Sequence, residues 1–193
     1  MADPAYIVDG VLTDGEAWGA LATAAPDGST NPITFTSTDD GQVGDFSQYM
    51  DLVLVLYCRD VVAATDHVNT GLRYNGDSGV GNYVFQRFYG DGATATATNG
   101  SGSVGYCMIF PANTATANAF GSAVVHIFDI NSGKYKSCVS QYAADRDGAG
   151  YAGIDAMTWQ SQAAITSVGV NAGNYFAAGS RIDLFGVLPR MVA

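Results

Sequence analysis

The aspartates of this chain are candidates for hydrolytic chemistry because several of them occur in close pairs. Asp39 lies beside Asp40, and Asp145 lies two residues before Asp147. A glycosidase uses two carboxyl groups, one as an acid and the other as a base or nucleophile. All four aspartates lie in glycine-rich turns, where aspartate is common because its side chain bonds to nearby backbone amides. We therefore predict that neither pair is catalytic and that the chain is not an enzyme.

The two histidines do not share a motif with any of these carboxylates. His67 lies in the loop segment ATDHVNT, where we expect a solvated side chain. His126 alternates with Val124, Phe128 and Ile130, which predicts a packed histidine with one hydrogen-bonded nitrogen. The motifs G-x-S-x-G, H-E-x-x-H and G-x-x-x-x-G-K-[ST] do not occur. We predict no catalytic residue.

Calcium is the metal that the acidic turns could best accommodate, since it prefers oxygen ligands on flexible loops. Asp145, Asp147 and Asp155 in DRDGAGYAGID come closest to an acidic cage. The segment lacks the third oxygen residue and the closing glutamate of an EF-hand loop. We interpret these aspartates as turn formers and predict no metal or cofactor, although the sequence leaves calcium binding by Asp145 and Asp147 open.

Tyrosine is abundant, with eleven copies, and four of them fall near the ends of expected loops. Exposed aromatic rings beside polar groups would allow a β-sandwich to bind carbohydrate, but tyrosine is also a common strand residue. Sugar binding, subunit contact and simple packing all remain open. The four tyrosines are Tyr83, Tyr89, Tyr142 and Tyr151.

The composition favours a β protein that avoids polyanions. The formal net charge is -10, only 13% of the residues are charged, and Glu16 is the single glutamate. Lysine occurs only as Lys134 and Lys136, so residues that favour long surface helices are scarce. An acidic chain does not bind phosphate backbones well, and no apolar run is long enough to span a bilayer. We therefore expect neither a nucleic acid nor a membrane partner, and no export signal.

Short apolar runs recur between turn clusters from Pro32 onward, which is typical of a sandwich or barrel. Leu52–Tyr57 is apolar throughout and predicts a central strand. The segment NGDSGVGN predicts a hairpin, and residues 131–133 predict another. The Ala/Thr tract before Val104 could be a thin strand or a loop, and residues 112–122 could hold one helical turn. The expected strands cover 33–37, 50–58, 70–74, 82–89, 104–110, 123–130, 134–142, 156–160, 163–170 and 180–188.

In residues 104–110 the alternation places Val104, Tyr106, Met108 and Phe110 on one face. Together the runs predict an all-β fold, an antiparallel two-sheet β-sandwich with jelly-roll-like topology.

The organisation that we predict is an extended N-terminal arm over residues 1–32, followed by one β-sandwich domain over residues 33–193. The first segment has no sustained strand or helix period. Its apolar side chains could pack on a neighbouring subunit or across their own domain. Three cysteines lie inside apolar runs, and we expect all of them to be reduced and buried. They are Cys58, Cys107 and Cys138.

Residues 50–188 resemble a recurrent type of virion protein from tailed bacteriophages. Three segments carry the resemblance: LVLVLYCRD, TGLRYNGDSGVGNYVFQRFYGDG and TWQSQAAITSVGVNAGNYFAAGSRIDLFGV. The matching residues are Arg59, Arg73, Asn75, Gly76, Asp77, Asn82, Tyr83, Trp159, Ser161, Ala164, Ile165, Thr166, Gly173, Asn174, Gly179, Ser180, Leu184 and Gly186.

The resemblance implies a jelly-roll-like domain on the outside of a phage particle, and the family offers no catalytic residue to carry over. We expect a homo-oligomeric decoration or cement protein, with a trimer as the expected oligomer, that binds the major capsid protein or other virion proteins. It would be assembled in the host cytoplasm and reside on the capsid surface. The alternative is a tail-fibre or spike module that recognises a host glycan.

Overall fold

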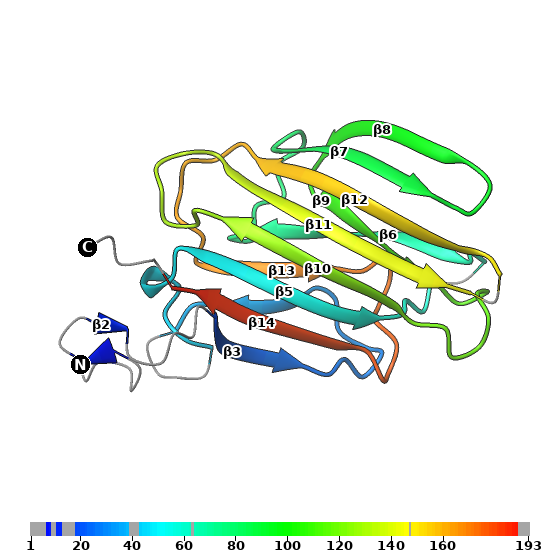
Figure 1. Ribbon diagram of the computed structural model, residues 1–193, viewed down its shortest axis with the longest axis horizontal. Helices are drawn as coiled ribbons and strands as arrows, with labels where there is room; N and C mark the ends of the chain where they lie inside the picture. The colour runs from blue at the N-terminus through cyan, green and yellow to red at the C-terminus, as the bar shows by residue number, and fades with distance from the viewer. Residues whose placement is uncertain are drawn as a thin grey trace.

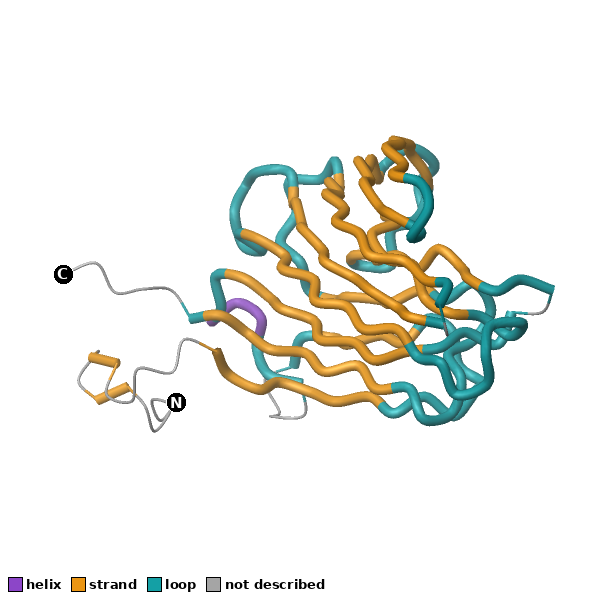
Figure 2. Tube along the Cα trace, turned by 45° about the vertical axis from the view of Figure 1, so that its right-hand side comes forward, coloured by secondary structure: helices purple, strands orange, loops and turns teal. Residues whose placement is uncertain are grey.

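Alternating apolar residues and frequent glycine turns produce a molecule built almost entirely of strands. The computed structural model describes residues 7–8, 11–12, 18–38, 43–62, 64–146 and 148–188. Figure 2 shows strands in two layers, and the one helical segment among the described residues is η1 (Phe46–Gln48). The prediction of an antiparallel two-sheet β-sandwich is confirmed.

The larger layer is an eight-stranded antiparallel sheet (Figure 1). Strand β5 lies inside this sheet, between β14 and β10, as its continuous apolar run predicts. In sheet order the strands are β3 (Trp18–Ala24), β14 (Arg181–Val187), β5 (Asp51–Cys58), β10 (Gly121–Phe128), β11 (Lys136–Asp145), β12 (Gly150–Trp159), β7 (Tyr83–Gly90) and β8 (Ala95–Gly102).

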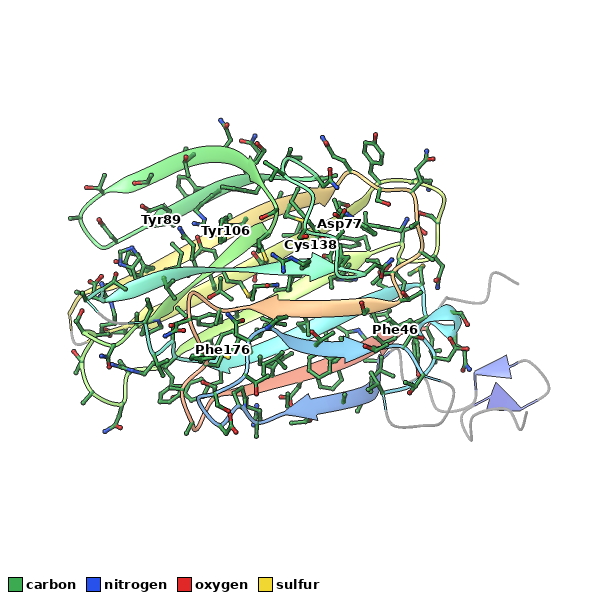
Figure 3. The ribbon with its side chains drawn as sticks, turned by 180° about the vertical axis from the view of Figure 1, so that it is seen from behind. Phe46, Asp77, Tyr89, Tyr106, Cys138 and Phe176 are labelled. Carbon is green, nitrogen blue, oxygen red and sulfur yellow. The ribbon has the colours of Figure 1, made fainter. Side chains whose placement is uncertain are left out.

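The smaller layer is a four-stranded antiparallel sheet that packs against one side of the larger one. Figure 3 looks at the molecule from this side. In sheet order its strands are β4 (Ile33–Thr36), β13 (Ser167–Asn171), β6 (His67–Tyr74) and β9 (Gly105–Pro111). Two further short strands, β1 (Ile7–Val8) and β2 (Val11–Leu12), pair with each other.

The strand pairing is that of a jelly roll. Eight strands form nested antiparallel pairs: β3 with β14, β4 with β13, β5 with β10, and β6 with β9. The first and third pairs lie in the large sheet, and the second and fourth lie in the small sheet. A long hairpin that wraps around a two-layer core has this arrangement.

Two insertions widen the large sheet beyond the four strands that it contributes to the jelly roll. The hairpin β7–β8 is inserted between β6 and β9, and the hairpin β11–β12 is inserted between β10 and β13. Together they add four strands beyond β10. The large sheet is therefore twice as many strands wide as the small sheet.

The core lies between the two sheets. Side chains on β11 alternate strictly between buried and exposed over its ten residues, because one face of the sheet meets the small sheet and the other does not. The largest fully buried apolar side chains include aromatic residues from five separate segments. They are Tyr74, Tyr83, Phe46, Phe110, Phe176, Leu52, Leu54, Leu56, Leu72, Met108 and Ile127.

The turn segment over residues 75–82 is not a hairpin, which corrects the sequence prediction. It joins β6 in the small sheet to β7 in the large sheet, so these two strands do not pair with each other. Positive φ angles at Asn75, Gly76 and Gly81 reverse the chain here. Glycine, asparagine and aspartate are common both in hairpin turns and in connections between two sheets, so the sequence pattern could not distinguish the two kinds of connection.

The predicted alternation along β9 is wrong because the strand contains a bulge. The register with β6 shifts between Thr70 and Gly71, so that Met108 and Tyr106 face consecutive residues of β6. Cys107 is consequently buried, whereas Tyr106 is 37% exposed. The bulge reverses the faces of the residues that precede it.

Several element boundaries also differ from the prediction. Strand β3 lies within the segment predicted as an arm, so the sandwich begins at Trp18 and not at residue 33. The Ala/Thr tract forms β8, and the glycine-rich segment before residue 156 forms the first half of β12. Residues 112–120 form turns without a helix, and residues 121–122 are the start of β10.

Candidate functional site

The side of the eight-stranded sheet that faces away from the small sheet is the main candidate for a functional surface. We call it the open face. Figure 1 looks onto it, and no described segment crosses it. Its side chains come from alternate positions of all eight strands, because successive strand residues point to opposite sides.

The open face is unusually rich in large apolar side chains. Among the described residues twelve large apolar side chains are exposed, and seven of these lie on this face. Phe88 is 55% exposed, and Val124 and Val139 lie near the middle of the sheet on the neighbouring strands β10 and β11. The seven residues are Trp18, Tyr57, Phe88, Val124, Phe128, Val139 and Ile154. Contiguous exposed apolar surface marks interaction sites.

Charged groups on the open face are few. Arg181 Nε lies 2.8 Å from Asp183 Oδ2, and Thr23 also donates to Asp183. His126 Nε2 lies 2.8 Å from Asp51 Oδ2. The exposed Asp145 lies on the same face, at the end of β11. Charged residues are therefore sparse near the middle of the face, as in the core of protein interfaces.

The middle of this face is hollowed into a shallow depression of about 440 Å³. Small and branched apolar residues make up most of its lining, and Ser122 and Gln141 are the polar residues among them. The lining residues that project outward are Val55, Ser122, Val124, Gln141, Ala143, Ala152 and Ile154.

Most of the polar residues that carry the bacteriophage resemblance hold loops together. The Asp77 carboxylate accepts hydrogen bonds from Trp159 Nε1 at 2.7 Å, from Gly79 N at 2.8 Å and from Asn82 Nδ2 at 2.9 Å. These bonds lower the pKa of Asp77, the Trp159 bond most strongly. Figure 3 shows Asp77 at one end of the sandwich.

Asn75 ties the same crossover to the segment before β13. Its Oδ1 accepts hydrogen bonds from the backbone amides of Thr166 and Ser167, and its Nδ2 donates to Ala164 O. The two sequence segments that resemble phage proteins therefore meet in space, although about ninety residues separate them. Their polar residues have a structural role at this end of the sandwich.

Arg59 and Asp60, just after the end of β5, also hold loops in place through hydrogen bonds. The guanidinium of Arg59 donates to four backbone carbonyls of residues 113–119. The buried Asp60 accepts from the backbone amides of Val62, Gly173 and Asn174. Both side chains are occupied in fixing loops.

His67 belongs to a polar cluster that the sequence did not reveal. Its Nδ1 lies 2.6 Å from Asp66 Oδ1 and 2.8 Å from Tyr151 Oη, and Arg146 contacts both Asp66 and Tyr151. The bond from Arg146, followed by that from His67, lowers the pKa of Asp66 to about 2. The cluster fastens the β11–β12 turn to the segment before β6.

Asp155 faces the core, so it does not join Asp145 in an acidic cage. Its carboxylate accepts from Arg87 Nε at 2.7 Å and from Tyr142 Oη at 3.1 Å. Burial raises the pKa of Asp155, and Arg87 opposes this effect. Within the described ranges, no three His, Cys, Asp or Glu side chains gather as metal ligands would.

The predicted carboxylate pairs fall largely outside the described residues. Asp39, Asp40 and Asp147 are not described by the structure. Asp145 lies at the end of β11, where its Oδ1 accepts from Gly148 N as expected of a turn aspartate.

The four tyrosines near loop ends do not form an exposed aromatic platform. Tyr83 and Tyr142 are buried, and Tyr83 stacks on Trp159 at a centroid distance of 6.4 Å. Tyr89 and Tyr151 are half-buried and contact each other edge to face. Tyr83 and Tyr142 therefore pack in the core and are not available for sugar binding or subunit contact.

The cysteine prediction is confirmed, since Cys58, Cys107 and Cys138 are all free and buried. Burial raises the pKa of Cys58 to about 12, so its thiolate is scarce near neutral pH. His126 has the expected hydrogen bond on one nitrogen, but it lies on the open face and stacks on Phe128 at 4.1 Å.

Comparison with protein-family models, curated proteins and solved structures found no match. Within the described part of the chain, no helix has the length and apolar character needed to cross a membrane.

Sequence reasoning missed the open face, although part of its signal was present. The outward positions of β10, β11 and β12 carry Val124, Val139 and Ile154, where a solvated face would carry charged residues. A run that is apolar on both faces predicts a strand covered on both sides. Here the second side has no cover within the described residues.

Proposed function

We propose that this chain is a structural protein of a bacteriophage virion, which decorates the outer capsid surface and stabilises it by contact. The observation that carries the proposal is the open face, a broad apolar surface with few charged groups that suits assembly. The jelly-roll topology supports it, because viral capsid proteins commonly use this architecture.

The use of the polar residues also supports a contact function. Arg59, Asn75 and Asp77 are among the residues that carry the resemblance, and they bind loops within the chain. The neighbouring Asp60 does the same. A rigid β-sandwich with fixed loops loses little conformational freedom on docking. Binding only to the assembled shell stabilises that shell by mass action, and many attached copies add avidity.

Residues 1–17 are our candidate for the segment that reaches the capsid. We propose that this segment ends before Trp18, because residues 18–24 form the edge strand β3 and pair with β14. Partners would be the major capsid protein or other virion proteins, after assembly in the host cytoplasm.

Co-sedimentation with particles that lack this protein tests the proposal. The purified chain should bind in many copies, and antibody labelling of intact particles should coat the head. A variant that lacks residues 1–17 should fold but bind less. Labelling of a few copies at the tail, or binding that does not depend on the assembled shell, would overturn the proposal.

A tail-fibre or spike module that binds a host glycan is the second candidate function. One feature favours it, a depression of about 390 Å³ on the small sheet, lined by Asn69, Arg73, Tyr106 and Asn171 among others. An aromatic ring beside amide and guanidinium groups suits sugar recognition. A glycan array probed with the wild-type chain and with Y106A tests it. Binding that Y106A abolishes would favour this function over decoration.

A further inference from the structure

The open face raises the question of what covers it, because a free surface of this kind is costly in water. Val53 projects towards the open face from β5, where it pairs with Phe185 on β14 and His126 on β10. It is fully buried. Around it the seven large apolar side chains of the open face remain exposed. Their burial would stabilise any complex that provides a matching surface.

The charge of the molecule restricts the choice of partner. Four of the basic side chains turn inward: Arg87 and Lys136 are buried, Arg59 binds backbone carbonyls, and the Arg146 side chain is 8% exposed. The formal net charge is -10, so the remaining surface is dominated by aspartate. Two copies therefore repel each other in most orientations. The open face carries few charged side chains and one internal Arg181–Asp183 ion pair, so it adds little to this repulsion.

The size of the face is that of a stable interface. Eight strands spaced about 4.8 Å apart, each at least seven residues long at about 3.3 Å per residue, cover about 800 Å². A standard interface buries about the same area on each partner. Two open faces could pack as sheet on sheet, about 10 Å apart.

From these observations we infer that the open face is a dimer interface, and that its occupant is the open face of a second copy of this chain. A two-fold dimer brings the same patch of both subunits together, whereas a three-fold ring needs two different patches on each subunit. Among the described residues the exposed apolar side chains concentrate on one face, which favours a two-fold pair over the trimer expected above.

A face-to-face dimer does not depend on the virion role. The oligomeric state of the purified chain is measured without any capsid, so failure of the dimer and failure of capsid binding are separate results.

Light scattering coupled to size-exclusion chromatography tests the dimer. At about 50 µM, well above the Kd of a standard interface, the wild-type chain of 20.0 kDa should show twice its monomer mass. Val124→Asp and Val139→Asp place a charge in the middle of the open face and should each halve that mass. Val80→Asp is the matched control, because Val80 is 92% exposed in the β6–β7 crossover, outside the face. It should remain dimeric.

A labelling experiment gives the same answer without introducing a charge. The native thiols are all buried, so Val139→Cys introduces the accessible one, and this near-isosteric change should preserve the fold. A maleimide should react with it at least tenfold more slowly at about 50 µM than at about 50 nM, across the concentrations where a dimer dissociates. Val80→Cys should react equally fast at both. A wild-type monomer at about 50 µM, a threefold mass, or Val139→Cys reactivity that is independent of concentration would overturn the inference.

Discussion

At the scale of the residue, the aspartates of this chain serve the fold. Every aspartate in the described part of the chain accepts at least one hydrogen bond from a backbone amide or a neighbouring side chain. Asp91 accepts from Ala93 N and Thr94 N, and Asp45 accepts from Ser47 N at the start of η1. This use explains the strong preference for aspartate over glutamate, because the shorter side chain reaches the amides of its own turn.

Asp155 is the residue whose loss should cost most. Asp155→Ala leaves the Arg87 guanidinium, 5% exposed, without its counter-ion inside the core. We expect the free energy of unfolding to fall by about 3–5 kcal/mol, as when one member of a buried pair is removed. Urea denaturation measures it. The double variant Arg87→Met with Asp155→Leu should regain much of the loss, and a single variant within about 0.5 kcal/mol of wild type would contradict the structural role.

Asp66 should make the protein sensitive to acid. Its pKa is about 2 in the folded protein, below the value of about 3.9 in an unfolded chain. The stabilisation is therefore complete above about pH 4 and is lost as the pH falls towards 2. Asp66→Asn should flatten the dependence of the free energy of unfolding on pH in this window. Identical slopes for variant and wild type, measured by urea titration at several pH values, would refute the assignment.

At the scale of the element, the crossover between β6 and β7 is held by the end of β12. Asp77→Ala removes the acceptor of the Trp159 indole, which is 3% exposed. Leaving that donor unpaired should cost about 1–3 kcal/mol in urea denaturation. The matched control is Asp27→Ala, an exposed turn aspartate that bonds only within its own turn to Ser29. It should cost less than about 0.5 kcal/mol, and equal losses in the two variants would argue against the crossover as a structural link.

The edge strand β3 sets the limit of N-terminal truncation. Removal of residues 1–24 strips β14 of one hydrogen-bonded neighbour and removes Leu21 and Ala22, which pack against the core. We expect a lower midpoint of thermal unfolding and aggregation through the new sheet edge. Circular dichroism and light scattering measure both effects. Removal of residues 1–17 is the control and should change neither, and equal behaviour of the two truncations would contradict a structural role for β3.

At the scale of the whole molecule, a net charge of -10 opposes self-association while the open face drives it. Salt screens the repulsion between exposed charges and leaves apolar burial intact. The dimer should therefore strengthen as sodium chloride rises from about 20 mM to about 500 mM, across which the Debye length falls severalfold. Sedimentation equilibrium gives the Kd at each concentration. A dimer that weakens with salt would point to an interface made of ion pairs.

Predictions from the sequence succeeded where the deciding interactions are local. The run Leu52–Tyr57 and the turn over residues 131–133 determine their own conformation, and both β5 and the β10–β11 hairpin lie where expected. The predictions were wrong where a neighbouring strand determines the conformation of a segment. Trp18–Ala24 has weak strand character and becomes a strand through β14, and the face that Tyr106 occupies depends on a bulge against β6.

The amino-acid sequence alone determined the all-β class, the two-sheet sandwich, the reduced cysteines and the acidic charge, because these follow from composition and from the two-residue period of strands. The tertiary structure decided which strands are neighbours, where the motif residues meet, and which side of the large sheet has no cover. The period of two separates the faces of a strand. It does not say what lies against each face, because that depends on segments distant in the chain.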